Sequence, residues 1–169
     1  MFINKIKDKV NELRTQYSLH SVPVDLTDLL EKENIIVIDK DFAEYERKVQ
    51  KSISGILYID GDTKLIFVNE RDNLRRKNFT VAHELGHYFL HYDRGKQDEV
   101  FVSFRGDSNP RETEANKFAA ELLLPDDKAR KEYESAMFPT ASYLAEKFEV
   151  SEQAMSIKLE QMGLRYIGL

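Results

Sequence analysis

The sequence of 169 residues contains no cysteine. The chain therefore cannot form disulfide bonds or a structural zinc site with thiolate ligands. Any bound metal ion needs nitrogen and oxygen ligands, a donor set that suits zinc among other metals. The sequence also lacks an apolar run of membrane-spanning length and the unbroken apolar segment of a signal peptide. These absences predict a cytoplasmic protein that does not enter a membrane.

An excess of positive charge is also missing. The chain has 25 Lys and Arg residues against 30 Asp and Glu residues, and its formal net charge is −5. Binding to the phosphates of a nucleic acid requires a basic face. We therefore expect no direct nucleic-acid binding.

The composition that is present, with 41% hydrophobic and 33% charged residues, is that of an ordinary globular protein whose length fits one domain. Hydrophobic periodicity, turn residues and the Asp-Gly step at 60–61 predict the elements. The expected strands cover residues 35–38, 53–59, 64–68 and about 99–104. The expected helices cover residues 2–18, 25–33, about 72–91, 110–125, and two or three pieces after 126. This pattern predicts an α+β fold with a small mixed sheet and a mostly helical C-terminal half.

The most informative motif is a group of histidines. Three of the four histidines, His83, His87 and His91, fall within nine residues, and the first two bracket Glu84 in an H-E-x-x-H pattern. On a helix, residues four apart lie on one face about 6 Å apart. Two imidazoles so placed can bind one zinc ion with bonds of about 2.0–2.1 Å. The neighbouring Glu84 can take a proton from a water molecule. We therefore predict His83 and His87 as metal ligands and Glu84 as the general base.

The alternative interpretation is that these polar residues lie on the exposed face of an ordinary helix. The apolar neighbours Val81, Leu85 and Phe89 argue against it, because buried histidines need polar partners. Gly86 costs about 1 kcal/mol relative to alanine inside a helix. Close packing of another backbone beneath a site would explain this glycine. The metal site is therefore favoured.

A catalytic zinc ion usually has three protein ligands. Candidates for the third are His91, Glu112, Glu114 and Glu121. His91 lies about 12 Å along the helix from His83, too far for the same ion. We expect it to contact a ligand or to end the helix. Glu112 fits the glutamate of a capping box that begins with Asn109. Helical spacing does not choose between the two remaining glutamates.

Two segments carry a family resemblance. Ala82-His-Glu-Leu-Gly-His87 and Glu114-Ala-Asn-Lys-Phe-Ala-Ala-Glu-Leu-Leu-Leu-Pro125 resemble the ImmA/IrrE family of metallo-endopeptidases. The likeness extends over most of the chain. It implies one compact zincin-like domain over residues 1–169. Its expected parts are an N-terminal helix and small sheet (about 1–71), metal-site helices that carry the HExxH motif (72–125) and C-terminal helices (126–169).

The resemblance also implies the site and the activity. It implies one zinc ion per chain bound by His83, His87 and Glu114, with Glu84 as the general base. The implied reaction is zinc-dependent hydrolysis of a specific peptide bond in a protein partner. That partner would be a helix-turn-helix repressor, often encoded nearby on a phage or mobile element, and cleavage would relieve repression. One departure concerns the aspartate that often follows the glutamate ligand of zincins by four residues and orients a histidine, because Phe118 occupies that position here.

Two other functions deserve comparison. A catalytically idle regulator could use the same shape to bind a repressor or toxin-like partner, but it would not need Glu84. The last two expected helices, over residues 140–163, have the form of a helix-turn-helix DNA reader. The second of them offers Lys158 as its only cation, so packing is the better interpretation. Leu144, Phe148, Ala154, Ile157 and Leu159 would then belong to the core.

Two features of substrate binding remain hypotheses at this point. We expect strand 64–68 to lie at an edge of the sheet, where a substrate could add as a further strand. A hydrogen-bond donor that stabilises the oxyanion is also needed. Tyr88, His91 and Tyr143 are candidates, and the sequence does not choose among them.

Overall fold

A four-stranded sheet supports the helices that bear the site. The structure, a computed structural model, describes residues 2–96 and 98–166. The strands run in the order β1-β3-β2-β4, with β1 parallel to β3 and the other two pairs antiparallel. The sheet is therefore mixed, as predicted. Its strands are β1 (Ile35–Lys40), β2 (Ile53–Asp60), β3 (Thr63–Asn69) and β4 (Asp98–Phe104).

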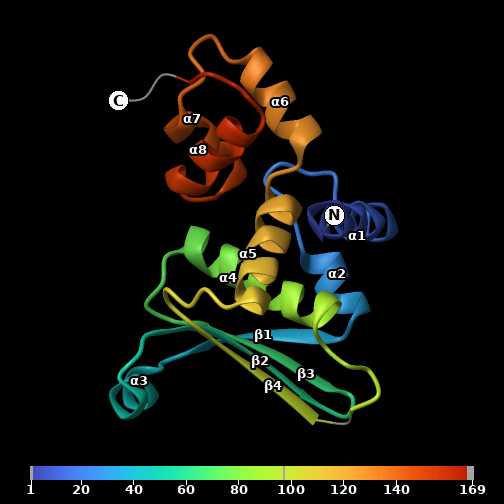
Figure 1. Cartoon of the computed structure of the whole chain (residues 1–169), viewed down its shortest axis with the longest axis vertical. Coiled ribbons are helices and arrows are strands. Elements are labelled where there is room, and N and C mark those ends of the chain that lie inside the picture. Colours follow the sequence, from blue (N-terminus) through green and yellow to red (C-terminus); the bar gives the residue numbers. More distant parts are fainter. Residues whose placement is uncertain (1, 97, 167–169) are drawn as a thin grey trace.

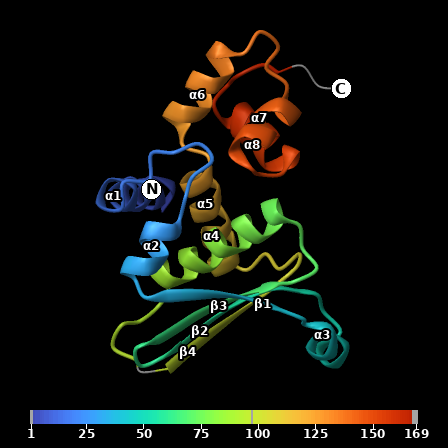
Figure 2. The same cartoon turned by 180° about the vertical axis from the view of Figure 1, so that it is seen from behind.

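The helices lie mainly on one side of this sheet. Figures 1 and 2 show α4 and α5 directly over the sheet, α1 and α2 beside them, and α6 to α8 beyond α5. The α+β fold with a mostly helical C-terminal half is confirmed. The helices are α1 (Phe2–Gln16), α2 (Thr27–Lys32), α3 (Ala43–Val49), α4 (Leu74–Leu90), α5 (Pro110–Leu123), α6 (Asp126–Ser135), α7 (Ala141–Phe148) and α8 (Glu152–Gln161). Within the described ranges, no helix is both long and apolar enough to span a membrane.

Helix α3, near one end of the sheet, is absent from the expected elements. None of its residues is buried. It therefore lacks the apolar stripe by which a surface helix is recognised in a sequence. Phe42, which precedes it, is only 1% exposed and fixes the start of the helix to the core.

The β2–β3 hairpin places β3 inside the sheet. Gly61 adopts a φ of 55° in the connecting turn, a conformation that glycine adopts without steric cost. β3 pairs with β2 on one side and with β1 on the other. The expectation that strand 64–68 forms a sheet edge is therefore wrong. The edges are β1 and β4, because the chain inserts β3 between two strands that precede it in the sequence.

Two glycines allow the layers to approach closely. A Cβ atom on Gly55 of β2 would lie 2.5 Å from Thr80 Cγ2 and 2.8 Å from Glu84 Oε1, so α4 lies directly on the strand. A Cβ atom on Gly86 would lie 3.0 Å from Ala115 Cα and 3.2 Å from Ala115 O of α5. The prediction that another backbone packs against Gly86 is confirmed. Together the two contacts fix α4 between the sheet and α5.

The C-terminal helices are joined to the rest by packing and by a buried cation. Leu144, Phe148 and Leu159 are buried as predicted, whereas Ile157 is 48% exposed and lies outside the core. Lys158 is 3% exposed, and its Nζ is paired with Glu121 Oε2 at 3.0 Å and with a carboxylate oxygen of Asp126. The only cation of α8 therefore ties this helix to α5 and α6 and is withheld from solvent.

Candidate metal centre

Helix α4 presents its two histidines toward the protein interior. Asn73 caps the helix by accepting a hydrogen bond from the backbone N–H of Arg76 at 3.0 Å. The four-residue spacing places His83 and His87 on one face, and their exposed fractions are only 6% and 1%. Their Nε2 atoms lie 3.1 Å apart. Both imidazoles therefore aim one nitrogen at the same point.

A carboxylate from α5 completes this point. Asn109 caps α5 by accepting from the backbone N–H of Glu112 at 3.1 Å, as the capping prediction required. The side chain of Glu112 does not turn back to the cap. Its Oε2 lies 3.1 Å from His83 Nε2, and its Oε1 lies 3.1 Å from His87 Nε2. Glu112 thus faces both histidines at once.

The third ligand implied by the family resemblance therefore needs correction. Glu114 lies away from the two Nε2 atoms, with its Oε2 3.0 Å from Nε2 of His91. The physical reason is the rotation of α5, which directs the side chain two residues earlier, Glu112, at the histidines of α4. Within the described residues, His83, His87 and Glu112 form the group of side chains that could hold a metal ion.

The donor set and its spacing fit a zinc ion. Tetrahedral bonds of about 2.0–2.1 Å separate neighbouring ligand atoms by roughly 3.3 Å. The separations of 3.1 Å between the nitrogen and oxygen atoms here are close to that value. Two imidazole nitrogens and a carboxylate suit zinc among other divalent metals. The three side chains can therefore converge on one ion with little movement.

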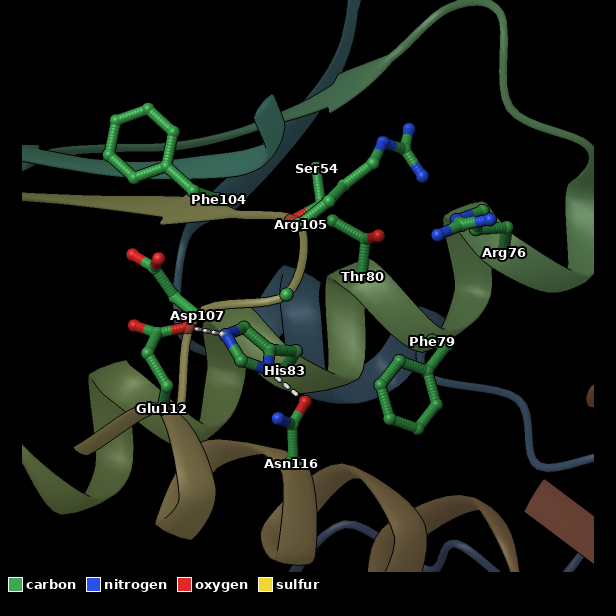
Figure 3. A pocket seen from close by; sticks show the side chains of 11 residues that line it. Ser54, Arg76, Phe79, Thr80, His83, Phe104, Arg105, Asp107, Glu112 and Asn116 are labelled. Carbon is green, nitrogen blue, oxygen red and sulfur yellow. Dashed lines mark hydrogen bonds and ion pairs between the residues drawn. The ribbon is translucent and has the colours of Figure 1, made fainter. Parts of the chain in front are cut away.

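The outer nitrogens of the two histidines are also held. His83 Nδ1 lies 2.9 Å from Oδ1 of Asn116. A dashed line marks this hydrogen bond in Figure 3. Asn116 follows Glu112 by four residues, so it fills the orienting position that seemed to fall on Phe118. His87 Nδ1 lies 3.0 Å from Nδ1 of His91, which confirms that His91 contacts a histidine at the end of α4. The sequence did not predict the role of Asn116, because that role depends on which glutamate of α5 faces the histidines.

Glu84 is buried beside this group. Its exposed fraction is 0%. Among the described residues, its two carboxylate oxygens are the only buried side-chain nitrogen or oxygen atoms without a hydrogen-bond partner. Burial raises the pKa of Glu84 to about 7, although the charge of His83 and weaker contacts with Ser103 and the Leu57 backbone work in the opposite direction. A carboxylate in this state has unused capacity to accept a hydrogen bond or a proton.

The electrostatics of the converging groups favour a charged Glu112. Burial raises its pKa, but the hydrogen bonds with His83 and His87 outweigh burial and lower it to about 2. For His83, burial is outweighed by the hydrogen bond with Glu112 and by the charges of Glu84 and Glu112, so its pKa is raised. Burial lowers the pKa of His87. An anionic carboxylate and a neutral His87 are the forms that bind metal.

Strand β4 and a cavity border the site. Ser103 Oγ of β4 lies 3.2 Å from His83 Nε2, and the ring of Phe101 stacks on His87 with centroids 5.1 Å apart. A cavity of about 170 Å³, large enough for a small side chain, lies beside His83. Figure 3 shows the side chains around it. The cavity is lined by Ser54, Arg76, Phe79, Thr80, His83, Phe104, Arg105, Gly106, Asp107, Glu112 and Asn116.

Two of the three candidate oxyanion donors have other partners. Tyr88 donates its hydroxyl to Glu33 Oε2 at 2.6 Å. His91 is occupied by His87 and Glu114. The remaining candidate, Tyr143, is 42% exposed on α7. The hydrogen bonds of Tyr88 and His91 therefore attach α4 to neighbouring parts of the protein.

The comparisons with known proteins agree with this site. A peptidase family model described as the IrrE N-terminal-like domain matches residues 30–160. The chain is 31% identical over 110 residues to Metallopeptidase ImmA of Bacillus subtilis (strain 168), covering 65% of this chain and 64% of that protein. It is 38% identical over 76 residues to Uncharacterized immunity region protein 2 of Bacillus phage phi105, covering 44% of this chain and 46% of that protein.

The matched part spans less than two thirds of the length of each relative. The family match is broader, because residues 30–160 include the sheet, the HExxH helix and α5. Since the match covers most of the sequence and all the converging side chains, this chain belongs to the ImmA/IrrE family of metallopeptidases.

Proposed function

We propose that this protein is a zinc-dependent endopeptidase that cleaves a specific peptide bond in a protein partner. In this proposal His83, His87 and Glu112 hold one zinc ion per chain, and Glu84 is the general base. The convergence of three ligand atoms within hydrogen-bond distance of one another supports the metal site. Their nitrogen and oxygen chemistry supports zinc among the divalent metals.

The observation that carries the peptidase proposal is the state of Glu84. A buried polar group without a partner costs about 1–3 kcal/mol, and a charged group costs more. Neither oxygen of Glu84 makes a hydrogen bond of good geometry, and only weaker contacts with Ser103 and the Leu57 backbone are present, although the residue is fully buried beside His83. A catalytically idle binding module has no use for such a group. A hydrolase needs it, because a proton must be removed from the attacking water.

The reaction follows from the positions of these side chains. When bound, the zinc ion supplies Lewis-acid polarisation of the scissile carbonyl and acidifies a water molecule. Glu84 accepts the proton of that water as its oxygen attacks the carbonyl carbon, and later delivers the proton to the departing amine. Asn116 holds the ring of His83 through Nδ1 during both steps. The closed, buried setting of Glu84 keeps bulk water from competing for the proton.

We infer that the substrate binds in extended form along β4. This strand is an edge of the sheet, so one side of its backbone is open to a further strand. Ser103 and Phe101 of β4 contact His83 and His87, so a segment paired with β4 would pass beside the scissile position. We therefore propose β4, the edge strand nearest the histidines, as the docking strand in place of strand 64–68.

The proposed partner is a helix-turn-helix repressor in the cytoplasm. One relative is named a metallopeptidase and the other an immunity region protein of a phage. Phage immunity depends on repression, so a repressor encoded beside this gene is the natural substrate to test. Direct DNA binding by α7 and α8 has little support, because the one cation of α8 is buried in ion pairs.

The test combines metal content with cleavage. Purified protein loaded with zinc is mixed with the neighbouring repressor, and fragments are detected by mass spectrometry. We expect one zinc ion per chain and a single cleavage site, with cleavage abolished by a chelator and by Glu84→Gln. Glu146→Gln, which changes an exposed carboxylate of α7, is the matched control and should cleave normally. Cleavage by Glu84→Gln at the wild-type rate would reject the assigned base.

Two further measurements test the ligand set and the docking edge. Glu112→Ala should weaken zinc binding by more than about 100-fold, beyond the usual effect of residues that only contact ligands. Hydrogen exchange of the zinc-loaded Glu84→Gln variant should show protection of residues 98–104 when the repressor is added. Protection of β1 in place of β4 would move the docking site to the opposite edge.

A further inference from the structure

A chain of three side chains leads from the proposed metal site to the surface of α5. His87 Nδ1 lies 3.0 Å from His91 Nδ1, and His91 Nε2 lies 3.0 Å from Glu114 Oε2. The side chain of His91 is 6% exposed and that of Glu114 is 32% exposed. The endopeptidase proposal gives no role to His91 or Glu114. Their alignment behind His87 nevertheless requires an explanation.

Once a metal ion takes the place of the proton between His87 Nε2 and Glu112, the hydrogen-bonding capacities of these groups permit one arrangement of protons. An ionised carboxylate only accepts hydrogen bonds, so Glu114 requires His91 to donate from Nε2. A neutral His91 then has an acceptor at Nδ1. His87 must therefore donate from its own Nδ1, which leaves the lone pair of its Nε2 free. That atom is the one that faces Glu112 at 3.1 Å.

We propose that Glu114 and His91 are positioning residues that set the tautomer and orientation of His87. The proton order imposed by Glu114 passes through His91 and presents His87 Nε2 as a ligand atom. Such groups behind a histidine ligand fix its ring and raise its basicity. The negative charge at the end also polarises the chain in the direction that strengthens both hydrogen bonds. This inference rests on the proposed metal site.

The other histidine ligand has a simpler arrangement. Oδ1 of Asn116 accepts directly from His83 Nδ1 at 2.9 Å, so His83 can likewise present the lone pair of its Nε2 to a metal ion. Helix α5 therefore supplies the carboxylate ligand and both orienting groups: Glu112, Glu114 and Asn116. Glu112 and Glu114 are two positions apart in the sequence. They have different roles because their side chains extend from α5 in different directions.

A purely structural role for the Glu114–His91 contact is the competing explanation. In that case the contact only joins the end of α4 to α5, and removing it would lower stability without changing the state of His87. The two explanations differ in the position of the protons of His91 in the zinc-loaded protein. They also differ in whether the effects of Glu114 and His91 on zinc binding depend on each other.

The first experiment reads the protons directly. Zinc-loaded protein labelled with ¹⁵N in histidine is studied by long-range ¹H–¹⁵N correlation NMR. We expect the proton of His91 on Nε2 and that of His87 on Nδ1. Glu114→Ala should convert His91 to a mixture of tautomers, whereas Glu114→Gln, whose amide oxygen still accepts, should largely preserve the wild-type pattern. A wild-type His91 protonated on Nδ1 would overturn the proposal.

The second experiment is a double-mutant cycle on zinc affinity, measured by competition with a chromophoric chelator. Glu114→Ala and His91→Ala should each weaken zinc binding by about 10–100-fold. Because Glu114 acts through His91, the double variant should bind zinc no more weakly than His91→Ala alone. Additive losses would overturn the proposal. Glu146→Gln controls for the loss of one negative charge, and circular dichroism checks that each variant is folded.

These measurements separate the two proposals. If the wild-type protein fails to bind zinc, the proposed function fails, and the positioning role that rests on it fails with it. If the wild type binds zinc and both variants bind it equally well, the positioning role is rejected and the endopeptidase proposal stands.

Discussion

Replacement of Gly86 by alanine tests the central packing contact of the site. In an open helix this change stabilises by about 1 kcal/mol, because glycine is the poorer helix former. Here the added Cβ meets Ala115 Cα at 3.0 Å and Ala115 O at 3.2 Å. These are backbone atoms, so no side-chain rotation relieves the contact. Overpacking of this kind costs about 1–3 kcal/mol.

The balance of these effects gives the expected magnitude. The free energy of unfolding of the metal-free protein should fall by about 0–2 kcal/mol, where an open helix would gain about 1 kcal/mol. Helix α5 must shift by a few tenths of an ångström, and Glu112 moves with it because it lies three residues before Ala115. Metal sites tolerate about 0.2 Å in ligand distance. Zinc affinity should therefore fall by at least about 10-fold.

Urea unfolding followed by circular dichroism measures the first effect, and chelator competition measures the second. The double variant Gly86→Ala/Ala115→Gly serves as a control. Trimming Ala115 removes its Cβ but leaves the two closer backbone contacts, so zinc affinity should not recover. A stabilised Gly86→Ala protein with wild-type zinc affinity would refute the close approach of α4 and α5.

Three other predictions concern the core and the C-terminal helices. Gly55→Ala should lower the free energy of unfolding by about 1–3 kcal/mol and abolish peptidase activity, because its Cβ would meet Glu84 Oε1 at 2.8 Å; a variant as stable and active as wild type would contradict this. Lys158→Met should lower the free energy of unfolding by about 2 kcal/mol, measured by urea unfolding. The loss is smaller than for a fully buried ion pair, because Asp126 is half-exposed. Lys128→Met on α6 is the control. Burial opposes ionisation of Asp126, but hydrogen bonds with Lys158 and Lys7 outweigh burial and lower the pKa of Asp126 below 3.8. The contribution of Asp126 to the free energy of unfolding is therefore present above pH 3.8 and is lost as the pH falls through the folded-state pKa. The stability difference between wild type and Asp126→Asn should accordingly be largest near neutral pH and disappear in acid; a difference that grows on acidification would reverse the assigned sign.

The sequence alone determined much of this protein through local patterns. The HExxH spacing identified two histidines that share a helix face, because four residues make about one helical turn. The Asp-Gly step identified the hairpin through its need for a positive φ, and Asn109 identified the start of α5. Gly86 indicated a close neighbour before that neighbour was known. Each inference uses interactions among residues that are near one another in the chain.

Only the tertiary structure decided between Glu112 and Glu114. Both lie near the start of the same helix, and their difference is the rotation of α5 about its own axis relative to α4. That rotation depends on the contact of Gly86 with Ala115 and on the buried face of α5, which includes Phe118. Periodicity gives the faces of a helix but not the direction in which each face points.

The order of the strands was likewise decided by long-range pairing. β1 pairs in parallel with β3, although β2 lies between them in the sequence. This pairing places β3 in the interior of the sheet and leaves β4 as the edge beside the histidines. The exposure of Ile157 and the burial of Lys158 also follow from how α8 lies against α5 and α6. These features depend on contacts between distant segments, whose energies are set only when the helices and strands assemble around a common core.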